Sequence, residues 1–309
     1  MTETHRSYTS SSAQTASTAF EFLYLYKGLR RAAVNMKAEV DELIQQVRDA
    51  EVIIERLYGK EIRNCKVLEV GVGQLPRQIA YFALNNDVIG IDLDVIPSHL
   101  RLDQYYQLFR TNGTKRLLKT IGRKILGMDR RFLRELRRAL GVTTLPMPKL
   151  CSMNATAMTF PDQSFDFVYS FNVFEHLPAP AAVLREIRRV LKPGGCVVSH
   201  LHLYTSDSGC HDVRILSGQR ECVPYWPHLR PHLASTVKNA AFINKLRISE
   251  WEMVFNTEMP ESVFVHYHDP DASLKMTMIT ELRSDGELKG YSDEELLTRN
   301  FASFWQKPM

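Results

Sequence analysis

The 309-residue sequence has few cysteines and no long apolar run, and each shortage excludes a class of protein. Its five cysteines are scattered, odd in number and never spaced as Cys-x-x-Cys. This pattern excludes a disulfide framework, offers no zinc signature and favours reduced thiols in a cytoplasm. No apolar stretch approaches the roughly 18 residues that a membrane-spanning helix needs. We therefore expect a cytoplasmic protein, and a peripheral position at the inner face of the membrane is the alternative.

The first 20 residues lack the features of a leader peptide. No basic stretch precedes an apolar core there, so we expect no secretory signal, and the richness in Ser and Thr predicts a disordered lead-in. Between residues 21 and 60 apolar residues recur at helical spacing, which predicts an N-terminal helical segment. Examples are Met36, Val40, Leu43, Ile44 and Val47.

Acidic residues are scarce in one internal segment, residues 95–150. This segment has 13 Lys and Arg against three Asp and Glu, a charge of +10 in a chain whose net charge is +4. Its apolar spacing predicts two amphipathic helices hinged at Gly127, with Asp129 opening the second. Three interpretations stay open: an anionic membrane surface, an anionic substrate, or a solvated face of a helical cap. Nucleic acid is the least favoured partner, because no base-reading or stacking module accompanies the charge.

Strand and helix patterns alternate from Cys65 onward. Strands are predicted at KVLEVGVG (66–73), DVIGIDLD (87–94), 149–154, FDFVYSF (165–171) and CVVSHLHL (196–203), with helices between most of them. Strands separated by helices predict a parallel sheet with right-handed crossovers. After residue 204 the patterns predict a helix at 248–256, strands at 262–268 and 274–282, and a closing helix at 292–305 capped by Ser292.

The turn GVGQLP (71–76) narrows the choice of ligand. A dinucleotide fingerprint requires glycine where Pro76 stands, and no Gly-Lys-Ser/Thr follows as in a P-loop, so phosphate ligands are disfavoured. Gly71 and Gly73 have no Cβ and let the backbone approach a ligand closely. Glu69 and Asp92, at the ends of two predicted strands, supply carboxylates suited to hydroxyl and ammonium groups.

Four motifs in order resemble those of class I S-adenosylmethionine (SAM)-dependent methyltransferases of the type 11 kind. They are Glu-x-Gly-x-Gly at 69–73, the acid Asp92, residues 153–177 (MNATAMTFPDQSFDFVYSFNVFEHL) and residues 183–200 (VLREIRRVLKPGGCVVSH). The resemblance covers roughly residues 61–203 without the insertion. It implies a Rossmann-like, doubly wound α/β fold with a seven-stranded, mostly parallel sheet. Residues 204–309 would then form a substrate cover and the last part of the sheet.

The resemblance also implies SAM as the cofactor and a set of residues that bind it: Glu69, Gly71, Gly73, Asp92, Asn154 and Ala155. Asp92 would bind the ribose hydroxyls, the turn after Glu69 the methionine end, and Asn154 with Ala155 the adenine. Two positions depart from the family, which usually has Asp at 154 and glycine at Leu75. The amide oxygen of Asn154 can still accept a hydrogen bond from the adenine amino group.

The acceptor of the methyl group is less constrained. An alcohol nucleophile needs a proton acceptor, and five of the ten histidines fall between residues 200 and 232. We predict His202 or His211 as the base, with His176 of the FEHL motif as a further candidate. A metal site at Asp207, His211 and Asp212 lacks a ligand spacing, so no metal is expected.

The basic insertion and the aromatic loop VPYWPHLRP (223–231) faintly resemble methyltransferases of surface-polysaccharide or natural-product glycan assembly. We therefore expect an oxygen of a saccharide or of a related small polar metabolite as the acceptor. Two other functions stay open: a non-catalytic relative that binds SAM or a partner protein, and an NAD-linked oxidoreductase, which Pro76 disfavours.

Overall fold

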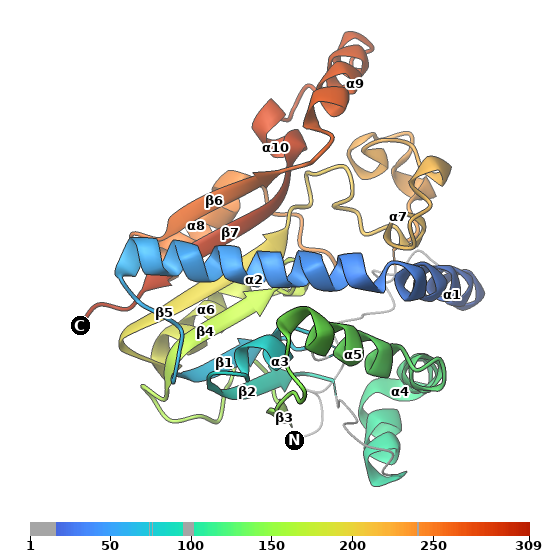
Figure 1. The fold of residues 1–309 in the computed structure, drawn as a ribbon. Coiled ribbons are helices and arrows are strands. Elements are labelled where there is room, and N and C mark those ends of the chain that lie inside the picture. Colours follow the sequence, from blue (N-terminus) through green and yellow to red (C-terminus); the bar gives the residue numbers. More distant parts are fainter. Residues whose placement is uncertain (1–16, 74, 76, 95–101, 240) are drawn as a thin grey trace.

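The computed structural model describes residues 17–309 except 74, 76, 95–101 and 240 (Figure 1). Seven strands of this part form one sheet in the order β3-β2-β1-β4-β5-β7-β6. The first five are parallel: β1 (Lys66–Val70), β2 (Asp87–Asp92), β3 (Lys149–Ser152), β4 (Phe165–Phe171) and β5 (Leu191–His202). β7 (Thr298–Gln306) runs antiparallel to both β5 and β6 (Val263–His268). The predicted doubly wound, mostly parallel α/β fold is confirmed.

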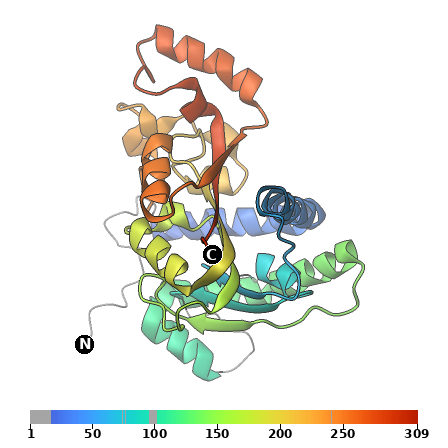
Figure 2. The same cartoon turned by 90° about the vertical axis from the view of Figure 1, so that its left-hand side faces the viewer.

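Helices cover both faces of the sheet (Figures 1 and 2). One face carries α2 (Met36–Tyr58), α3 (Gln78–Phe82) and α5 (Met128–Leu140), and the other carries α6 (Pro180–Val190) and α8 (Ile248–Glu258). Because successive strand residues point to opposite faces, Phe167 and Tyr169 of β4 join the core under α2, whereas Val168 joins the core under α6. Two buried cores therefore hold the sheet rigidly between them.

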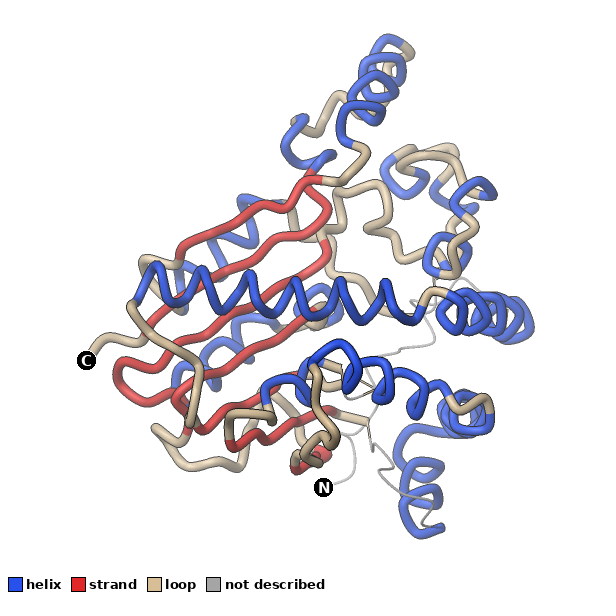
Figure 3. Tube along the Cα trace, in the orientation of Figure 1, coloured by secondary structure: helices blue, strands red, loops and turns tan. Residues whose placement is uncertain are grey.

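The remaining helices lie beyond the ends of the strands (Figure 3). They are α1 (Thr18–Val34), α4 (Leu102–Ile125), α7 (Val213–Leu216), α9 (Ala272–Ser284) and α10 (Asp293–Leu297), with short 3-10 turns such as η2 (Phe174–His176). None of the helices in the described residues has both the length and the apolar character needed to cross a membrane.

The N-terminal segment begins earlier than expected and is broken once. α1 starts at Thr18, where the side chain of Ser17 accepts the backbone N–H of Phe20, so residues 18–20 are helical and not a disordered lead-in. Residues 1–16 lie outside the described part. The helix is interrupted at Asn35, and α2 carries the buried stripe that the sequence predicted.

Two expectations near the C-terminus are wrong. Residues 274–282 are helical in α9, whose buried residues Lys275 and Ile279 are one helical turn apart. The predicted closing helix at 292–305 ends at Leu297, and the chain continues as β7. β7 lies between β5 and β6, so its side chains are buried on both faces and lack the alternation that identifies a strand.

The predicted hinge of the basic insertion lies at Gly127, which has a φ of 63° and separates α4 from α5. Asp129 lies in the first turn of α5 and pairs with Arg123 across the hinge at 2.8 Å. α4 is itself kinked at Gly113, where φ is 81°. The start of the insertion, residues 95–101, lies outside the described part.

Candidate functional site

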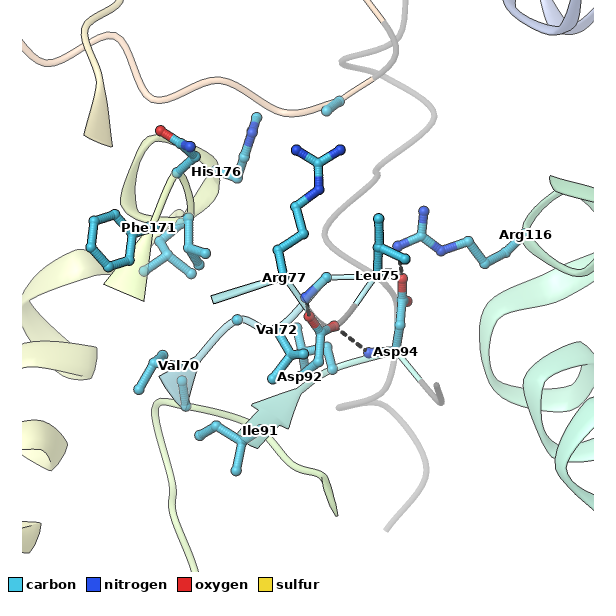
Figure 4. A pocket seen from close by; sticks show the side chains of 18 of the residues that line it. Val70, Val72, Leu75, Arg77, Ile91, Asp92, Asp94, Arg116, Phe171 and His176 are labelled. Atoms are coloured by element: carbon cyan, nitrogen blue, oxygen red, sulfur yellow. Dashed lines mark hydrogen bonds and ion pairs between the residues drawn. The ribbon is translucent and has the colours of Figure 1, made fainter. Parts of the chain in front are cut away.

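A cavity of about 660 Å³ lies at the carboxyl ends of β1, β2 and β4 (Figure 4). The order of strands reverses between β1 and β4, and open α/β sheets bind ligands at such a switch point. The cavity wall includes the segments that follow these strands, 71–73, 92–94 and 171–173. Further parts of the wall come from α1, α2, α4 and α5 and from residues 153–156, 176–179 and 241–242.

The two glycines of the first turn line the cavity, and they differ in their surroundings. Gly71 has a φ of 83°, and a Cβ there would lie 2.4 Å from Cγ2 of Val173. Gly73 has a φ of 67°, and a Cβ there would meet no atom within 4 Å. Gly71 thus allows two loops to approach one another, whereas Gly73 leaves bare backbone at the cavity. Pro76, on which the choice against a dinucleotide rested, lies outside the described residues.

Asp92 lies at the end of β2 and lines the cavity (Figure 4). Its Oδ2 accepts the N–H of Gly73 at 2.8 Å, and its Oδ1 accepts the N–H of Asp94 at 2.8 Å. Burial raises the pKa of this carboxyl, and the two N–H groups oppose the rise. Each oxygen keeps a second lone pair for a hydroxyl group of a ligand.

Asn154 and Ala155 also line the cavity, after β3. Oδ1 of Asn154 accepts the backbone N–H and the hydroxyl of Thr156, both at 2.9 Å. A backbone N–H can only donate, so this contact identifies the amide oxygen and commits it to the turn. The amide nitrogen is the group of Asn154 that remains for a ligand, which differs from the expectation that the oxygen would accept from adenine.

Glu69 does not line the cavity. Its side chain is buried beneath the turn and accepts the hydroxyl hydrogen of Tyr169 at 2.9 Å. Burial raises the pKa of Glu69 to about 8. The carboxyl group therefore links β1 to Tyr169 of β4 in the buried core behind the cavity.

Among the three predicted histidines, His176 lines the cavity (Figure 4), whereas His202 and His211 lie outside its wall. The Nδ1 of His176 lies 2.8 Å from the carbonyl oxygen of Phe242. A carbonyl only accepts, so the proton sits on Nδ1 and the neutral ring keeps Nε2 as an acceptor. Burial lowers the pKa of His176.

His211 and His202 continue behind His176 as a line of rings. The ring centres of His176 and His211 are 5.0 Å apart, and Nε2 of His211 lies 3.1 Å from Nδ1 of His202. Nε2 of His202 contacts the hydroxyl of Ser208 at 2.9 Å. Burial lowers the pKa of His202 to about 3 and that of His211 well below its ordinary value, so both rings are neutral at pH 7.

The acidic side chains of the loop after β5 form ion pairs with arginines. Asp212 accepts from Arg214 at 2.6 Å, and Asp207 accepts from Arg220 at 2.7 Å. In the part of the chain that the structure describes, no three His, Cys, Asp or Glu side chains gather as metal ligands.

Trp226 of the aromatic loop is fully buried beside Leu288 and packs the C-terminal part together.

Sequence reasoning did not identify the second half of the cavity wall. Apolar side chains from α1, α2 and α5 line it, including Leu29, Met36, Met128 and Phe132. Five cationic side chains line it as well: Arg77, Lys115, Arg116, Lys119 and Arg123. Four of these belong to the basic insertion, whose charge was noticed but whose orientation depends on how α4 packs.

Comparison with known proteins shows that this chain is similar to methyltransferases. A family model described as "Methyltransferase domain" matches residues 111–199. An uncharacterized methyltransferase of Mycobacterium tuberculosis is 38% identical over 72 residues, which cover 22% of this chain and 28% of that protein. The 2-methyl-6-phytyl-1,4-hydroquinone methyltransferase of Synechocystis sp. is 47% identical over 45 residues, 15% of this chain and 14% of that protein. The matched segments thus span less than a third of these curated relatives.

One similar solved structure is that of Haemonchus contortus phosphoethanolamine N-methyltransferase 2 in complex with S-adenosyl-L-methionine. The similarity has a TM-score of 0.40 and 16% sequence identity, and it covers 84% of this chain and 53% of that one.

Proposed function

Because the chain belongs to the class I SAM-dependent methyltransferase family, we propose that it transfers a methyl group from SAM to an oxygen of a saccharide or of a related small polar metabolite. One observation carries the proposal. The cavity at the switch point brings together Gly71, Gly73, Asp92, Asn154 and Ala155, which come from three separate segments of the chain.

The residues around the cavity fit SAM, which has hydroxyl, amino and carboxylate groups but no phosphate. The bare backbone at Gly73 leaves room for close approach, since no atom lies within 4 Å of where its Cβ would be. The spare lone pairs of Asp92 suit the two ribose hydroxyls. The amide nitrogen of Asn154 would donate to a ring nitrogen of adenine, beside Ala155. Glu69 would act indirectly, by fixing the end of β1 against Tyr169 of β4.

When bound, SAM supplies an electrophilic methyl group on a sulfonium centre. A hydroxyl nucleophile must lose a proton as it reacts, and a positioned base accelerates this step. We assign this task to Nε2 of His176, because its other nitrogen is held as a donor by the carbonyl of Phe242. Its lowered pKa keeps the ring neutral at pH 7.

Thermal unfolding with S-adenosylhomocysteine (SAH), with NAD and with neither ligand tests the proposal. SAH at about 100 times its dissociation constant should add roughly 2.7 kcal/mol to the stability of the native state. The shift should vanish in Asp92→Ala and persist in Asp87→Ala, which removes an exposed carboxylate from the opposite end of β2. Consumption of SAM with a cell-envelope extract then separates an enzyme from a non-catalytic binder.

A stabilisation against thermal unfolding by NAD in place of SAH would contradict the proposal and favour an oxidoreductase. A shift with SAH that Asp92→Ala leaves intact would contradict the assignment of the ribose site.

A further inference from the structure

α4 turns its charged face toward the cavity. After the kink at Gly113, the residues of α4 that line the cavity follow the spacing of a single helical face and are all cations: Lys115, Arg116, Lys119 and Arg123. We call this set the α4 cationic face. Meanwhile Leu118 and Ile125 of the same helix are 51% and 79% exposed. A solvated charged face would have the opposite orientation, with cations outward and apolar residues inward.

In the ion pairs seen between described residues, the cations around this face outnumber the carboxylates. Lys115 and Lys119 both pair with Glu21 of α1, whose side chain is almost completely buried. One nearly buried carboxylate therefore pairs with two ammonium groups, whose side chains are 31% and 23% exposed. Coulomb interactions are stronger there than at a surface, so the excess positive charge is costly.

The same imbalance recurs one turn further along the insertion. Arg123 and Lys124 share the carboxylate of Asp129, at 2.8 and 3.0 Å. Arg116 pairs with Asp94, whose neighbour Asp92 belongs to the proposed cofactor site. In these ion pairs, three carboxylates (Glu21, Asp94 and Asp129) pair with five cations.

Burial adds to the cost of these charges. It lowers the pKa of Lys115, of Lys119 and of Arg123, because each cation has lost water around it. A ligand that brings negative charge into the cavity would restore some of the lost solvation. A neutral ligand would displace water from the cations and would increase the cost.

Arg77 extends the positive wall toward the proposed base. Its side chain extends from the start of α3 into the cavity, between His176 on one side and Arg116 on the other (Figure 4). Its nearest carboxylate is Glu39 at 3.8 Å, and both side chains are partly exposed, so the pair is weak. Arg77 is thus placed to contact a ligand that spans the cavity between His176 and α4.

We propose that the methyl acceptor carries an anionic oxygen group, a phosphate or a carboxylate, and that the α4 cationic face together with Arg77 binds this group. The inference rests on the proposed function, because it names the substrate class of the same cavity. The less polar part of the acceptor would lie against the apolar wall made by Leu29, Met36 and Phe132.

Calorimetric titration of the full-length protein, saturated with SAH, tests this inference. Three probes are compared: glucose 6-phosphate, glucuronate and glucose. We expect at least one of the two anions to bind about tenfold more tightly than glucose, as a charge-assisted hydrogen bond requires. The tighter of the two anions identifies the group as phosphate or carboxylate.

Two substitutions in the same ion cluster should have opposite effects. Lys119→Gln should weaken binding of the preferred anion about tenfold, whereas Glu21→Gln should strengthen it by removing the competing carboxylate. A general folding defect would weaken binding in both variants. Arg110→Gln, an exposed change on α4 outside the cavity wall, should leave binding unchanged.

Equal binding of glucose and both anions would overturn the inference. So would a loss of SAH affinity in Lys119→Gln as large as its loss of anion affinity, because the cations would then serve the carboxylate of the cofactor. If the wild-type protein fails to bind SAH, the proposed function fails, and the titrations repeated without SAH still decide the charge inference.

Discussion

Two glycines of one turn show how residues of the same type take different tasks. Gly71 and Gly73 both have positive φ and are two positions apart. The side chain of Val173 fills the space beside Gly71, whereas the space beside Gly73 is open. The first glycine is therefore required for packing, and the second for access to the cavity.

Gly71→Ala should destabilise the fold by about 3 kcal/mol, since the added methyl group meets Val173 and the backbone is strained. Gly73→Ala should cost only about 1–2 kcal/mol, from strain alone, yet it should abolish binding of SAH. Urea unfolding and SAH titration measure the two effects.

Gly286→Ala is the matched control, because Gly286 has a φ of 92° and open space around it, far from the cavity. It should lose stability like Gly73→Ala and bind SAH normally. Equal SAH affinity in Gly73→Ala and the wild type would contradict the role given to Gly73.

At the scale of elements, a capping box fixes the start of α10, the short helix that leads into β7. Ser292 accepts the N–H of Glu295 at 3.2 Å, and the carboxylate of Glu295 accepts the N–H of Ser292 at 3.0 Å. This capping box starts α10, which is only five residues long. Arg247 binds the same carboxylate at 2.6 Å and ties the helix to the start of α8.

Ser292→Ala should lower the free energy of unfolding by about 1 kcal/mol, because one N–H at the start of α10 loses its partner. Ser273→Ala removes an exposed hydroxyl from α9 and should leave stability nearly unchanged. Urea midpoints compare the two variants, and an equal loss in both would show that the cap contributes nothing.

At the scale of the whole molecule, five histidines share an environment that disfavours their charged form. Burial lowers the pKa of His176 and His211, brings that of His200 and His228 to about 4, and brings that of His202 to about 3. The unfolded chain takes up protons at these rings below about pH 6.5, whereas the folded chain does not. Their contribution to stability is therefore present above pH 6.5 and is lost as the pH falls toward 4 and 3.

The free energy of unfolding of the wild-type protein should fall steeply between pH 6.5 and 4. His202→Gln removes one of the buried rings. The free energy of unfolding of this variant should therefore fall less steeply over that range. Asn256→Ala changes an exposed side chain of α8 that has no titratable group, and it should keep the wild-type slope. Urea titrations at several pH values measure the slopes, and identical slopes in all three proteins would contradict this account.

Local patterns were enough to predict much of the fold. The strand at 165–171 follows from a short apolar run, and the hinge at Gly127 follows from a glycine between two amphipathic stretches. The cavity residues Asp92 and Asn154 were identified because motifs placed them at strand ends. β7 and α9 were misassigned because their burial depends on neighbours that are distant in the chain.

The positions of the histidines and of the charged helix required the packing of distant segments. His202 lies on β5, one strand away from the switch point, so it lies behind His176 and not in the cavity wall. The periodicity of α4 predicts an apolar and a cationic face, but which face turns inward depends on Glu21 of α1, about 100 residues earlier in the chain. Amino-acid order thus specified the elements and the cofactor motifs, because these arise from neighbours along the chain. The orientation of the cationic face came from contacts between elements, which no local pattern encodes.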